Sequence, residues 1–356
     1  MTIGIIGGGQ LGMMLVEAIK HLGHNAIALD PNPKCSCSTF CDVIVGEYDD
    51  ITKLEELCNK CDVLTYEFEN ISSQALYLIE KSNKLKQGIL PLEISQNRLK
   101  EKAFALKHGL KTVKYKPIYN KEELVEGLKE IGYPSIYKTS TLGYDGHGQY
   151  VIRSSKDIDK VDLDKEGILE SMLDFDYEAS IILFNDGVNI RYLPISVNVA
   201  YKNILDLSIV NDNIPIKDKL IKYSVDFMKN SDLRGIITLE YFIKDNEIYF
   251  NEMAPRPHNS GHYSIEGCDY SQYEMLTKYL LGEELPTPKL LSSTVMKNIL
   301  GYNYDNFNNM IIDNNTFKHD YHKTGIKEYR KMAHVTFTNT TLDDYNKKYK
   351  KFFKEI

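Results

Sequence analysis

A glycine-rich turn near the start of the chain restricts the possible folds more than any other feature. The apolar run 2–6 leads into Gly7-x-Gly9-x-x-Gly12, and the next apolar run closes at Asp30. A strand, a tight glycine turn and a helix in this order outline the first unit of a dinucleotide-binding βαβ fold. The motif predicts a parallel α/β sheet here and leaves open whether its ligand is NAD or something else.

Strand and helix patterns alternate through the first 95 residues. Apolar runs typical of strands occur at 2–6, 25–30, 43–45 and 63–66, with helical spacing at 11–22 and 51–59. Such alternation places helices on the faces of a parallel sheet. We therefore expect an N-terminal Rossmann-like domain over residues 1–95.

The bulk properties exclude several classes of protein. With 356 residues the chain can form two or three domains, and its net charge of −7 argues against a general nucleic-acid or anionic-membrane surface. No run approaches the roughly 18 apolar residues of a membrane span, and the N-terminus lacks the basic start of a secretory signal. We expect a cytoplasmic protein without nucleic-acid or membrane partners, in which a local basic pocket for an anion stays possible.

The six cysteines are expected to be free thiols. Five of them crowd into residues 35–61 and include a Cys-x-x-Cys pair. Cys58 and Cys61 continue the apolar stripe of a short helix, which favours a role in the core over the four-ligand geometry of a metal site. A zinc or iron–sulfur site is the weaker alternative.

The remaining chain divides into a long central part and a short C-terminal part. Expected helices lie at 95–107, 122–131, 218–229 and 273–281, and expected strands at 134–138, 167–170, 178–184, 191–197, 235–244 and 247–251. The last two strands form an antiparallel pair around Asp245-Asn246. Pro286 and Pro288 predict a linker, after which residues 290–356 look β-rich with a basic final helix. The predicted domains are 1–95, 96–286 and 287–356.

A pair of glutamates on the predicted hairpin is the first candidate site. Glu240 and Glu252 lie on successive strands, and Asn251 precedes the second glutamate. Two carboxylates and an amide oxygen facing one cleft suit Mg²⁺, which prefers few protein ligands together with phosphate oxygens. Taken alone, the pair reads more readily as two exposed strand residues.

The segment after the second glutamate favours the functional interpretation. "RPHNSGH" places Arg256, His258, Asn259 and His262 in a loop punctuated by proline and glycine. A loop has little structural need for so many polar donors, and arginine offers a planar fork to phosphate or carboxylate oxygens.

A second glycine-rich loop follows Lys138. Gly143, Gly146 and Gly148 would let backbone N–H groups close on phosphates, and Lys138 would neutralise a phosphate charge. An ordinary hairpin turn beside an exposed lysine is the alternative. Phosphoryl transfer needs a metal, a lysine and a backbone cradle together, and the chain supplies all three in order.

Six motifs together resemble one family of enzymes. They are "GGGQLGMML", "YEFENI", "QNRLKEK", "GYDGHGQ", "NEMAPRPHNSGH" and "RKMAHVT". In this order they are similar to the ATP-grasp ligases, and more narrowly to the N5-carboxyaminoimidazole ribonucleotide synthetases of purine biosynthesis. The resemblance covers nearly the whole chain. It implies an ATP-grasp fold over 96–286, with a lid at about 110–168, between the Rossmann-like domain and a small β-rich C-terminal domain.

The resemblance implies an ATP-dependent carboxylation. Enzymes of this family use ATP and bicarbonate to carboxylate the exocyclic amine of 5-aminoimidazole ribonucleotide, with carboxyphosphate as the intermediate. Carboxyphosphate is short-lived in water, so a closing lid is required, and the loop 143–149 is the expected lid. A homodimer is also implied.

The resemblance assigns roles residue by residue. Glu240 and Glu252 would hold Mg²⁺. The expected ATP contacts are Arg98, Lys138, Gly143, Tyr144, Asp145, Gly146, His147, Gly148, Gln149, Glu170, Ser171, Met172, Leu173, Glu178, Asn251 and Glu252. Residues 170–173 match the hinge whose backbone reads adenine, and Glu178 matches the position that binds the ribose hydroxyls.

The first glycine turn would face the ribonucleotide rather than NAD. Gln10, Leu11, Glu67 and Asn70 would lie beside 5-aminoimidazole ribonucleotide, and Lys323, Arg330, Lys331 and Arg256 would surround its phosphate. Tyr144, Asp145, Arg256 and His258 are the candidate catalytic residues. Which of them, if any, moves a proton stays open.

Three positions depart from the family pattern. His147 stands where a lysine or arginine is usual, Ala200 where an ATP-contacting histidine is frequent, and Ala333 where a glycine is usual. Weaker ATP binding is one expected consequence of the first two.

Three rival interpretations fit parts of the sequence. An NAD-dependent dehydrogenase explains only residues 4–30. Another ATP-grasp enzyme, such as the formate-dependent glycinamide ribonucleotide transformylase, shares the glycine and "RPH" elements, but "NSGH" favours the carboxylating family. A non-catalytic descendant would fit His147 and Ala200, yet not the intact Glu240, Asn251 and Glu252.

Overall fold

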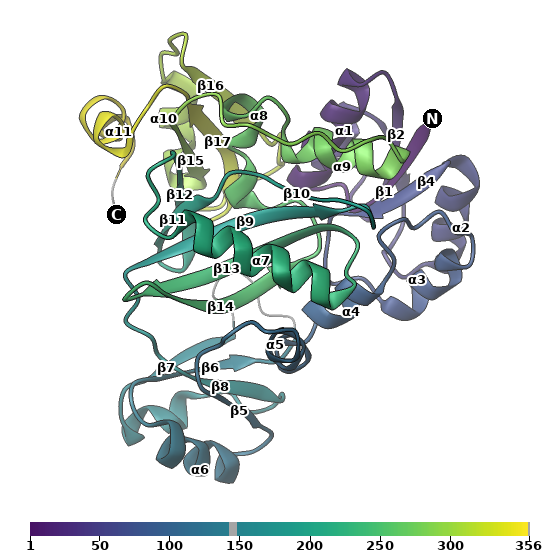
Figure 1. The fold of residues 1–356 in the computed structure, drawn as a ribbon. Coiled ribbons are helices and arrows are strands. Elements are labelled where there is room, and N and C mark those ends of the chain that lie inside the picture. The colour runs from purple at the N-terminus through teal and green to yellow at the C-terminus, as the bar shows by residue number, and fades with distance from the viewer. Residues whose placement is uncertain (142–147, 355–356) are drawn as a thin grey trace.

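The computed structural model describes residues 1–141 and 148–354 and contains three β-sheets (Figure 1). A four-stranded parallel sheet forms the N-terminal part. A nine-stranded sheet forms the centre and runs on into the C-terminal part. A second four-stranded sheet, with α6 packed on it, lies below β14 of the central sheet in the view of Figure 1.

The N-terminal sheet has the strand order β3-β2-β1-β4, and all its pairs are parallel. Its strands are β1 (Thr2–Ile6), β2 (Asn25–Asp30), β3 (Asp42–Val45) and β4 (Val63–Tyr66), and its helices are α1 (Gln10–His21), α2 (Ile51–Lys60) and α3 (Ser73–Glu80), with a short 3₁₀ turn at Ser36–Thr39. The predicted Rossmann-like arrangement is confirmed. All six cysteines are free, as expected.

The helix expected over 95–107 is wrong at its start, because the chain forms two helices there. α4 (Leu90–Ser95) ends before Gln96, and α5 (Arg98–Lys107) begins after Asn97. The Asn97 side chain accepts hydrogen bonds from the backbone N–H groups of Leu99 and Lys100, which is the role of an N-cap. The break leaves Arg98 in the first turn of α5.

The smaller antiparallel sheet has the order β5-β8-β6-β7. It comprises β5 (Tyr115–Ile118), β6 (Ser135–Thr139), β7 (Gln149–Ile152) and β8 (Gly167–Ser171), with α6 (Lys121–Ile131) and a 3₁₀ turn at Ser155–Lys160. Lys138 and Gln149 face each other across β6 and β7.

The central sheet runs β14-β13-β9-β11-β12-β15-β17-β16, with β10 paired to β9. Its bounds are β9 (Tyr177–Asn185), β10 (Ile190–Tyr192), β11 (Ser196–Tyr201), β12 (Ile204–Val210), β13 (Gly235–Lys244), β14 (Glu247–Ala254), β15 (Thr294–Leu300), β16 (Thr316–Asp320) and β17 (Lys331–Phe337). The expected single strand at 191–197 is wrong. Pro194, which has no N–H to donate to a ladder, separates β10 from β11.

Side-chain alternation divides the central sheet into two faces. Ala179, Ile181 and Leu183 of β9 pack with Leu220 and Phe227 of α7 (Lys217–Ser231), which lies along β9 and β13 in Figure 1. Because successive strand residues point to opposite faces, Ser180 and Ile182 lie on the other face.

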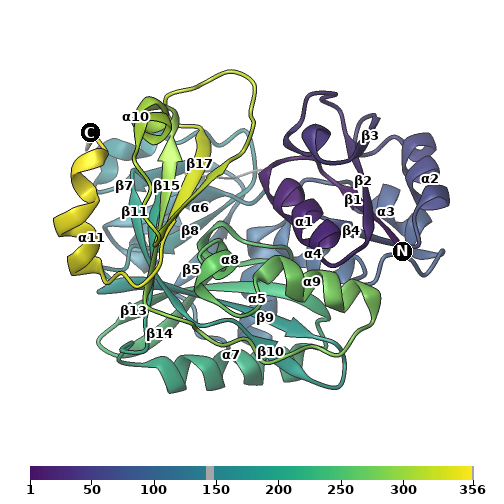
Figure 2. The ribbon, with the colours of Figure 1, turned by 90° about the horizontal axis from the view of Figure 1, so that it is seen from above.

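The face opposite α7 meets the N-terminal sheet through α9 (Gln272–Leu281). Ile182 and Phe184 of β9 share a core cluster with Tyr273 of α9 and Leu15 of α1. Figure 2 shows α9 running between the central sheet and α1. This packing holds the glycine turn close to the central sheet.

The C-terminal part extends the central sheet instead of forming a separate one. β12 pairs with β15, which pairs with β17. The remaining helical elements are α8 (Ser264–Gly267), α10 (Tyr304–Asn309), α11 (Leu342–Lys348) and 3₁₀ turns at Asn259–Gly261, Gly301–Asn303 and Lys350–Phe352. No helix within the described ranges is long and apolar enough to span a bilayer.

Candidate active site

The acidic pair lies at the open end of the β13–β14 hairpin. Glu240 and Glu252 are direct cross-strand neighbours, so their side chains point to the same face. The register shifts by one residue immediately afterwards, because Tyr241 pairs with Phe250 and Asn251 has no opposite residue. This is a β-bulge, a feature that re-aims side chains beside active sites.

The donor set fits Mg²⁺. Asn251 Oδ1 is buried and has no hydrogen-bond partner among the described residues. With the two carboxylates it supplies hard oxygen ligands that leave positions for phosphate oxygens, as Mg²⁺ requires. No cluster of three or more histidine, cysteine, aspartate or glutamate side chains suited to a metal occurs within 1–141 and 148–354.

The two carboxylates have opposite electrostatic environments. Burial, with the charges of Glu252 and Glu178, raises the pKa of Glu240 well above its ordinary value. Burial opposes ionisation of Glu252 as well, but the charges of Arg98 and Lys138 reverse this and lower its pKa. Arg98 Nη1 lies 3.3 Å from Glu252 Oε2. A cation between the carboxylates would relieve their mutual repulsion.

A buried ion-pair cluster lies next to this pair. Glu170 Oε2 is 2.6 Å from Lys138 Nζ, and Glu170 Oε1 is 3.0 Å from Lys102 Nζ. Burial opposes ionisation of Glu170, yet the two lysines hold its pKa below the usual value. Lys102 Nζ also donates to the backbone oxygen of Asn251 at 2.9 Å. The cluster therefore joins β6, β8 and α5 to the strand that carries Glu252.

The "RPHNSGH" loop lies over the acidic pair. His258 Nε2 is 3.5 Å from Glu240 Oε1. Arg256 Nε is 2.9 Å from Glu69 Oε1, so the arginine connects this loop to the segment after β4. His262 instead is buried and contacts the hydroxyl of Tyr273 at 3.0 Å.

The glycine turn contacts an acidic side chain from β4. Gly9 N–H donates to Glu67 Oε1 at 2.8 Å. Gly7 has φ of +109°, and a Cβ there would lie 2.7 Å from Glu67 Cγ, so both the backbone conformation and the space require glycine. Burial raises the pKa of Glu67 to about 7, against the opposing hydrogen bond from Gly9.

A basic segment from the C-terminal part reaches the same turn. Lys323 Nζ donates to Gln10 Oε1 at the start of α1, and to the backbone oxygen of Lys331 at 2.8 Å. Arg330 Nη1 donates to the backbone oxygen of Thr324 at 2.8 Å. Residues 10 and 323, at opposite ends of the sequence, thus form one wall.

The structure brings most predicted site residues into three connected groups: the acidic pair with Arg98 and His258, the lysine cluster around Glu170, and the turn with Glu67 and Lys323. Glu178 is half-buried, and burial together with the charge of Glu252 raises its pKa to about 7. In the segment expected to read adenine, Ser171 ends β8, and Met172, which follows it, is exposed and precedes Leu173. Of the residues expected beside the ribonucleotide, Leu11 is buried in α1 and Asn70 is exposed. Gly143, Tyr144, Asp145, Gly146 and His147 lie outside the described residues.

Two groups of residues were missed by sequence reasoning. Lys102 has no role in the sequence analysis beyond its place in the helix expected at 95–107, although its i+4 spacing from Arg98 places both side chains on one face. Ser180, Ser196 and Asn198 lie on the same face of the sheet as the acidic pair. The alternation of small polar and apolar residues along their strands is the sequence pattern that could have indicated this. Ala200 is exposed at a bulge in β11, and Ala333 is buried in β17.

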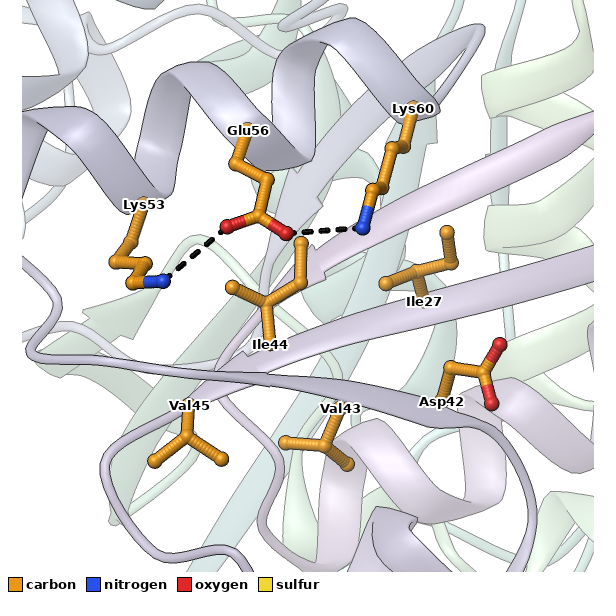
Figure 3. Close-up of a pocket in the computed structure, with 8 residues that line it drawn as sticks. All are labelled: Ile27, Asp42, Val43, Ile44, Val45, Lys53, Glu56 and Lys60. Atoms are coloured by element: carbon orange, nitrogen blue, oxygen red, sulfur yellow. Dashed lines mark hydrogen bonds and ion pairs between the residues drawn. The ribbon is translucent and has the colours of Figure 1, made fainter.

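A separate surface hollow contains none of the predicted site residues. It is lined by Ile27, Asp42, Val43, Ile44, Val45, Lys53, Glu56 and Lys60 (Figure 3). These residues come from β2, β3 and α2, at the edge of the N-terminal sheet. Glu56 is held there between Lys53 and Lys60.

Comparisons with known proteins agree along nearly the whole chain. Residues 1–96 match the ribonucleotide synthetase preATP-grasp domain, residues 103–273 the ATP-grasp domain, and residues 294–348 the phosphoribosylaminoimidazole carboxylase C-terminal domain. The N5-carboxyaminoimidazole ribonucleotide synthase of Staphylococcus aureus (strain N315) is 37% identical over 360 residues, covering 99% of this chain and 96% of the relative. The chain belongs to the N5-carboxyaminoimidazole ribonucleotide synthase family. It is thus an ATP-grasp ligase, and neither a dehydrogenase nor a formate-dependent transformylase fits this family assignment.

Solved structures of family members have the same fold. The Staphylococcus aureus N5-carboxyaminoimidazole synthetase in complex with ADP superposes with a TM-score of 0.93 at 37% identity, covering 99% of this chain and 96% of that one. The Aspergillus clavatus carboxyaminoimidazole ribonucleotide synthase in complex with ATP gives 0.90 at 26% identity, covering 99% and 97%. Nucleotide binding is thus a property of solved members of this family.

Proposed function

We propose that this chain carboxylates the exocyclic amine of 5-aminoimidazole ribonucleotide, using ATP and bicarbonate, and releases N5-carboxyaminoimidazole ribonucleotide, ADP and phosphate. The observation that carries the proposal is the acidic pair of Glu240 and Glu252, with Arg98 against it and beside it the Asn251 oxygen, which has no hydrogen-bond partner in the described part of the chain. The family assignment supplies the substrate class, and this geometry supports retention of the phosphoryl-transfer machinery.

Phosphoryl transfer would occur at the acidic pair. An oxygen of bicarbonate attacks the γ-phosphorus of ATP, ADP leaves, and carboxyphosphate forms. Bound Mg²⁺, held by Glu240, Glu252 and Asn251, would neutralise phosphate charge. Arg98 and Lys138 would add positive charge to the phosphate oxygens, and Glu178, whose pKa is raised by burial, would face the ribose hydroxyls.

Carbon–nitrogen bond formation follows at the other side of the cleft. The amine of the ribonucleotide attacks the carboxyl carbon, either of carboxyphosphate or of CO₂ released from it. The bond between that carbon and the phosphate oxygen breaks, and the amine gives up a proton. Gln10, Glu67 and Asn70 would orient the aminoimidazole, and Lys323, Arg330, Lys331 and Arg256 would surround its phosphate. Excluding water at this stage protects the intermediate, which is the role expected of the loop at 143–149.

We further propose that the enzyme works as a cytoplasmic homodimer. Six free cysteines are compatible with a reducing compartment. The homodimer is a family expectation, and sedimentation equilibrium of the purified chain at micromolar concentration would test it. A single species of monomer mass would contradict it.

The deciding experiment measures phosphate release from ATP. Purified enzyme with Mg²⁺ and bicarbonate should release phosphate slowly, and 5-aminoimidazole ribonucleotide should stimulate release strongly. Carbon-14 from labelled bicarbonate should appear in the ribonucleotide, with one labelled carboxyl group for each phosphate that the ribonucleotide-dependent reaction releases. No stimulation by the ribonucleotide would overturn the proposed function and would favour a non-catalytic descendant of the family.

A further inference from the structure

A row of polar side chains crosses the central sheet and includes the acidic pair. Cross-strand pairing places four side chains in succession on one face of the sheet. They are Glu252 on β14, Glu240 on β13, Ser180 on β9 and Ser196 on β11. Asn198 lies one pleat further along β11 on the same face. Ser180, Ser196 and Asn198 are all buried, so their polar groups must be satisfied within the protein.

These groups form a hydrogen-bonded chain that ends on His258. Ser180 Oγ accepts from Asn198 Nδ2 at 3.1 Å and lies 2.8 Å from Ser196 Oγ. It donates to Ser260 Oγ at 2.6 Å, and Ser260 Oγ lies 2.8 Å from His258 Nδ1. Because Ser260 Oγ accepts the hydrogen of Ser180, its own hydrogen is available for His258 Nδ1.

A backbone group settles which imidazole nitrogen accepts. The N–H of Ser260 points at His258 Nδ1, 3.3 Å away, and a backbone N–H can only donate. Two donors therefore converge on Nδ1, which must be unprotonated in the neutral ring. The hydrogen of the neutral imidazole is then on Nε2, the nitrogen that lies 3.5 Å from Glu240 Oε1.

We propose that Ser180 and Ser260 hold His258 as the tautomer protonated on Nε2, so that His258 orients the Glu240 carboxylate as a hydrogen donor and is not the general base of the reaction. The proposal rests on the proposed function for the reaction itself, but the tautomer is a property of the free protein. It makes His258, Ser260 and Ser180 positioning residues for Glu240, and it assigns removal of the amine proton to another group.

Nitrogen NMR of the free protein tests the tautomer directly. The full-length chain, labelled with ¹⁵N-histidine, is measured at pH 9, where an ordinary imidazole is neutral. His258 is identified by its loss in His258→Asn. We expect a protonated Nε2 and an unprotonated Nδ1. A hydrogen on Nδ1 would overturn the proposal whether or not the enzyme turns over.

Variants that break the hydrogen-bonded chain from Ser180 to His258 test its effect on catalysis. Ser260→Ala and Ser180→Ala should raise the Mg²⁺ concentration for half-maximal phosphate release about 10- to 100-fold, the effect typical of groups that orient a metal ligand. The KM for 5-aminoimidazole ribonucleotide should not change. Ser260→Thr, which keeps a hydroxyl, should have a half-maximal Mg²⁺ concentration close to that of wild type.

The matched control is Ser224→Ala. Ser224 is also a buried serine, but it donates to Leu220 O and contacts Tyr241 Oη on the α7 side of the sheet. Its loss should lower stability without changing the Mg²⁺ dependence. Equal effects of Ser180→Ala and Ser224→Ala on Mg²⁺ dependence would overturn the positioning role. If a serine variant does not fold, the wild-type NMR result still decides the tautomer.

Discussion

At the scale of single residues, charge placement distinguishes the members of the site. Glu240 and Glu252 are equivalent in sequence pattern, yet burial and like charge raise the pKa of Glu240, whereas Arg98 and Lys138 lower that of Glu252. Neighbouring groups also decide whether Lys102 can be buried. A buried ammonium group is tolerated only where oxygens receive its hydrogens, and Lys102 Nζ contacts Glu170 Oε1 and the backbone oxygen of Asn251.

Glu252→Gln should abolish phosphate release without unfolding the protein. The change removes one negative charge facing the proposed cation, and a loss of several kcal/mol of transition-state stabilisation corresponds to about 10²- to 10³-fold in kcat. The measurement is ATP-dependent phosphate release, with circular dichroism as the control for folding. Turnover within a few-fold of wild type would contradict the assignment of this carboxylate.

Lys102→Met should destabilise the protein by about 3 kcal/mol, because removing one member of a buried ion pair leaves the other less compensated. Lys102 and Glu170 are 3% and 5% exposed, so solvent cannot replace the lost contact. Urea unfolding measures the change. Lys121→Met, which removes an exposed ion pair with Asp159, is the control and should change stability little. Equal losses in the two variants would contradict the role of the buried cluster.

At the scale of elements, turns and breaks place the functional groups. The turn before α1 needs positive φ at Gly7 and brings Gly9 N–H to Glu67. The bulge in β14 frees Asn251, and the break at Asn97 starts α5 at Arg98. Each device is local, but each aims a side chain at a residue distant in sequence.

Glu67→Gln should change how stability depends on pH. The folded-state pKa of about 7 lies above the ordinary value of 4.5, so the folded state binds the proton more tightly than the unfolded state does. The stability contributed by protonated Glu67 is complete below about pH 4.5 and is lost as pH rises through about 7. Relative to wild type, Glu67→Gln should therefore gain stability across this interval, by up to about 3 kcal/mol.

Urea unfolding at pH 5, 6 and 8 would measure this difference. Glutamine can keep the acceptor for Gly9 N–H, so the variant tests charge and not the hydrogen bond. A difference between variant and wild type that does not change with pH would contradict the raised pKa of Glu67.

At the scale of the whole molecule, the site is assembled from all three sheets. The central sheet supplies the acidic pair, the smaller antiparallel sheet supplies Lys138 and Glu170, and the N-terminal sheet supplies the glycine turn. The core shared by α1, α9 and β9 keeps the turn in place, and Lys323 joins it from the C-terminal part.

Lys323→Ala should raise the KM for 5-aminoimidazole ribonucleotide about tenfold, the loss of one hydrogen bond to a charged group, and leave the KM for ATP unchanged. Steady-state kinetics with each substrate varied in turn would measure both constants. Lys318→Ala is the control, because Lys318 is a half-buried lysine of the neighbouring strand β16 whose ammonium group contacts Asn308 O and the Phe307 ring. A rise confined to the KM for ATP would contradict the placement of the phosphate pocket.

The sequence by itself determined most of the N-terminal elements and their parallel arrangement, because turn chemistry and apolar periodicity are local properties. The facing of Glu240 and Glu252 depends on the bulge in β14, since an unbroken hairpin around Asp245-Asn246 would pair Glu240 with Asn251. The tertiary structure alone decided which distant groups meet: Lys102 with Glu170, Gln10 with Lys323, and the serine row with His258. Such contacts depend on strand order and register across the sheets. No local pattern encodes these, since residues far apart in the chain become neighbours only when the core packs.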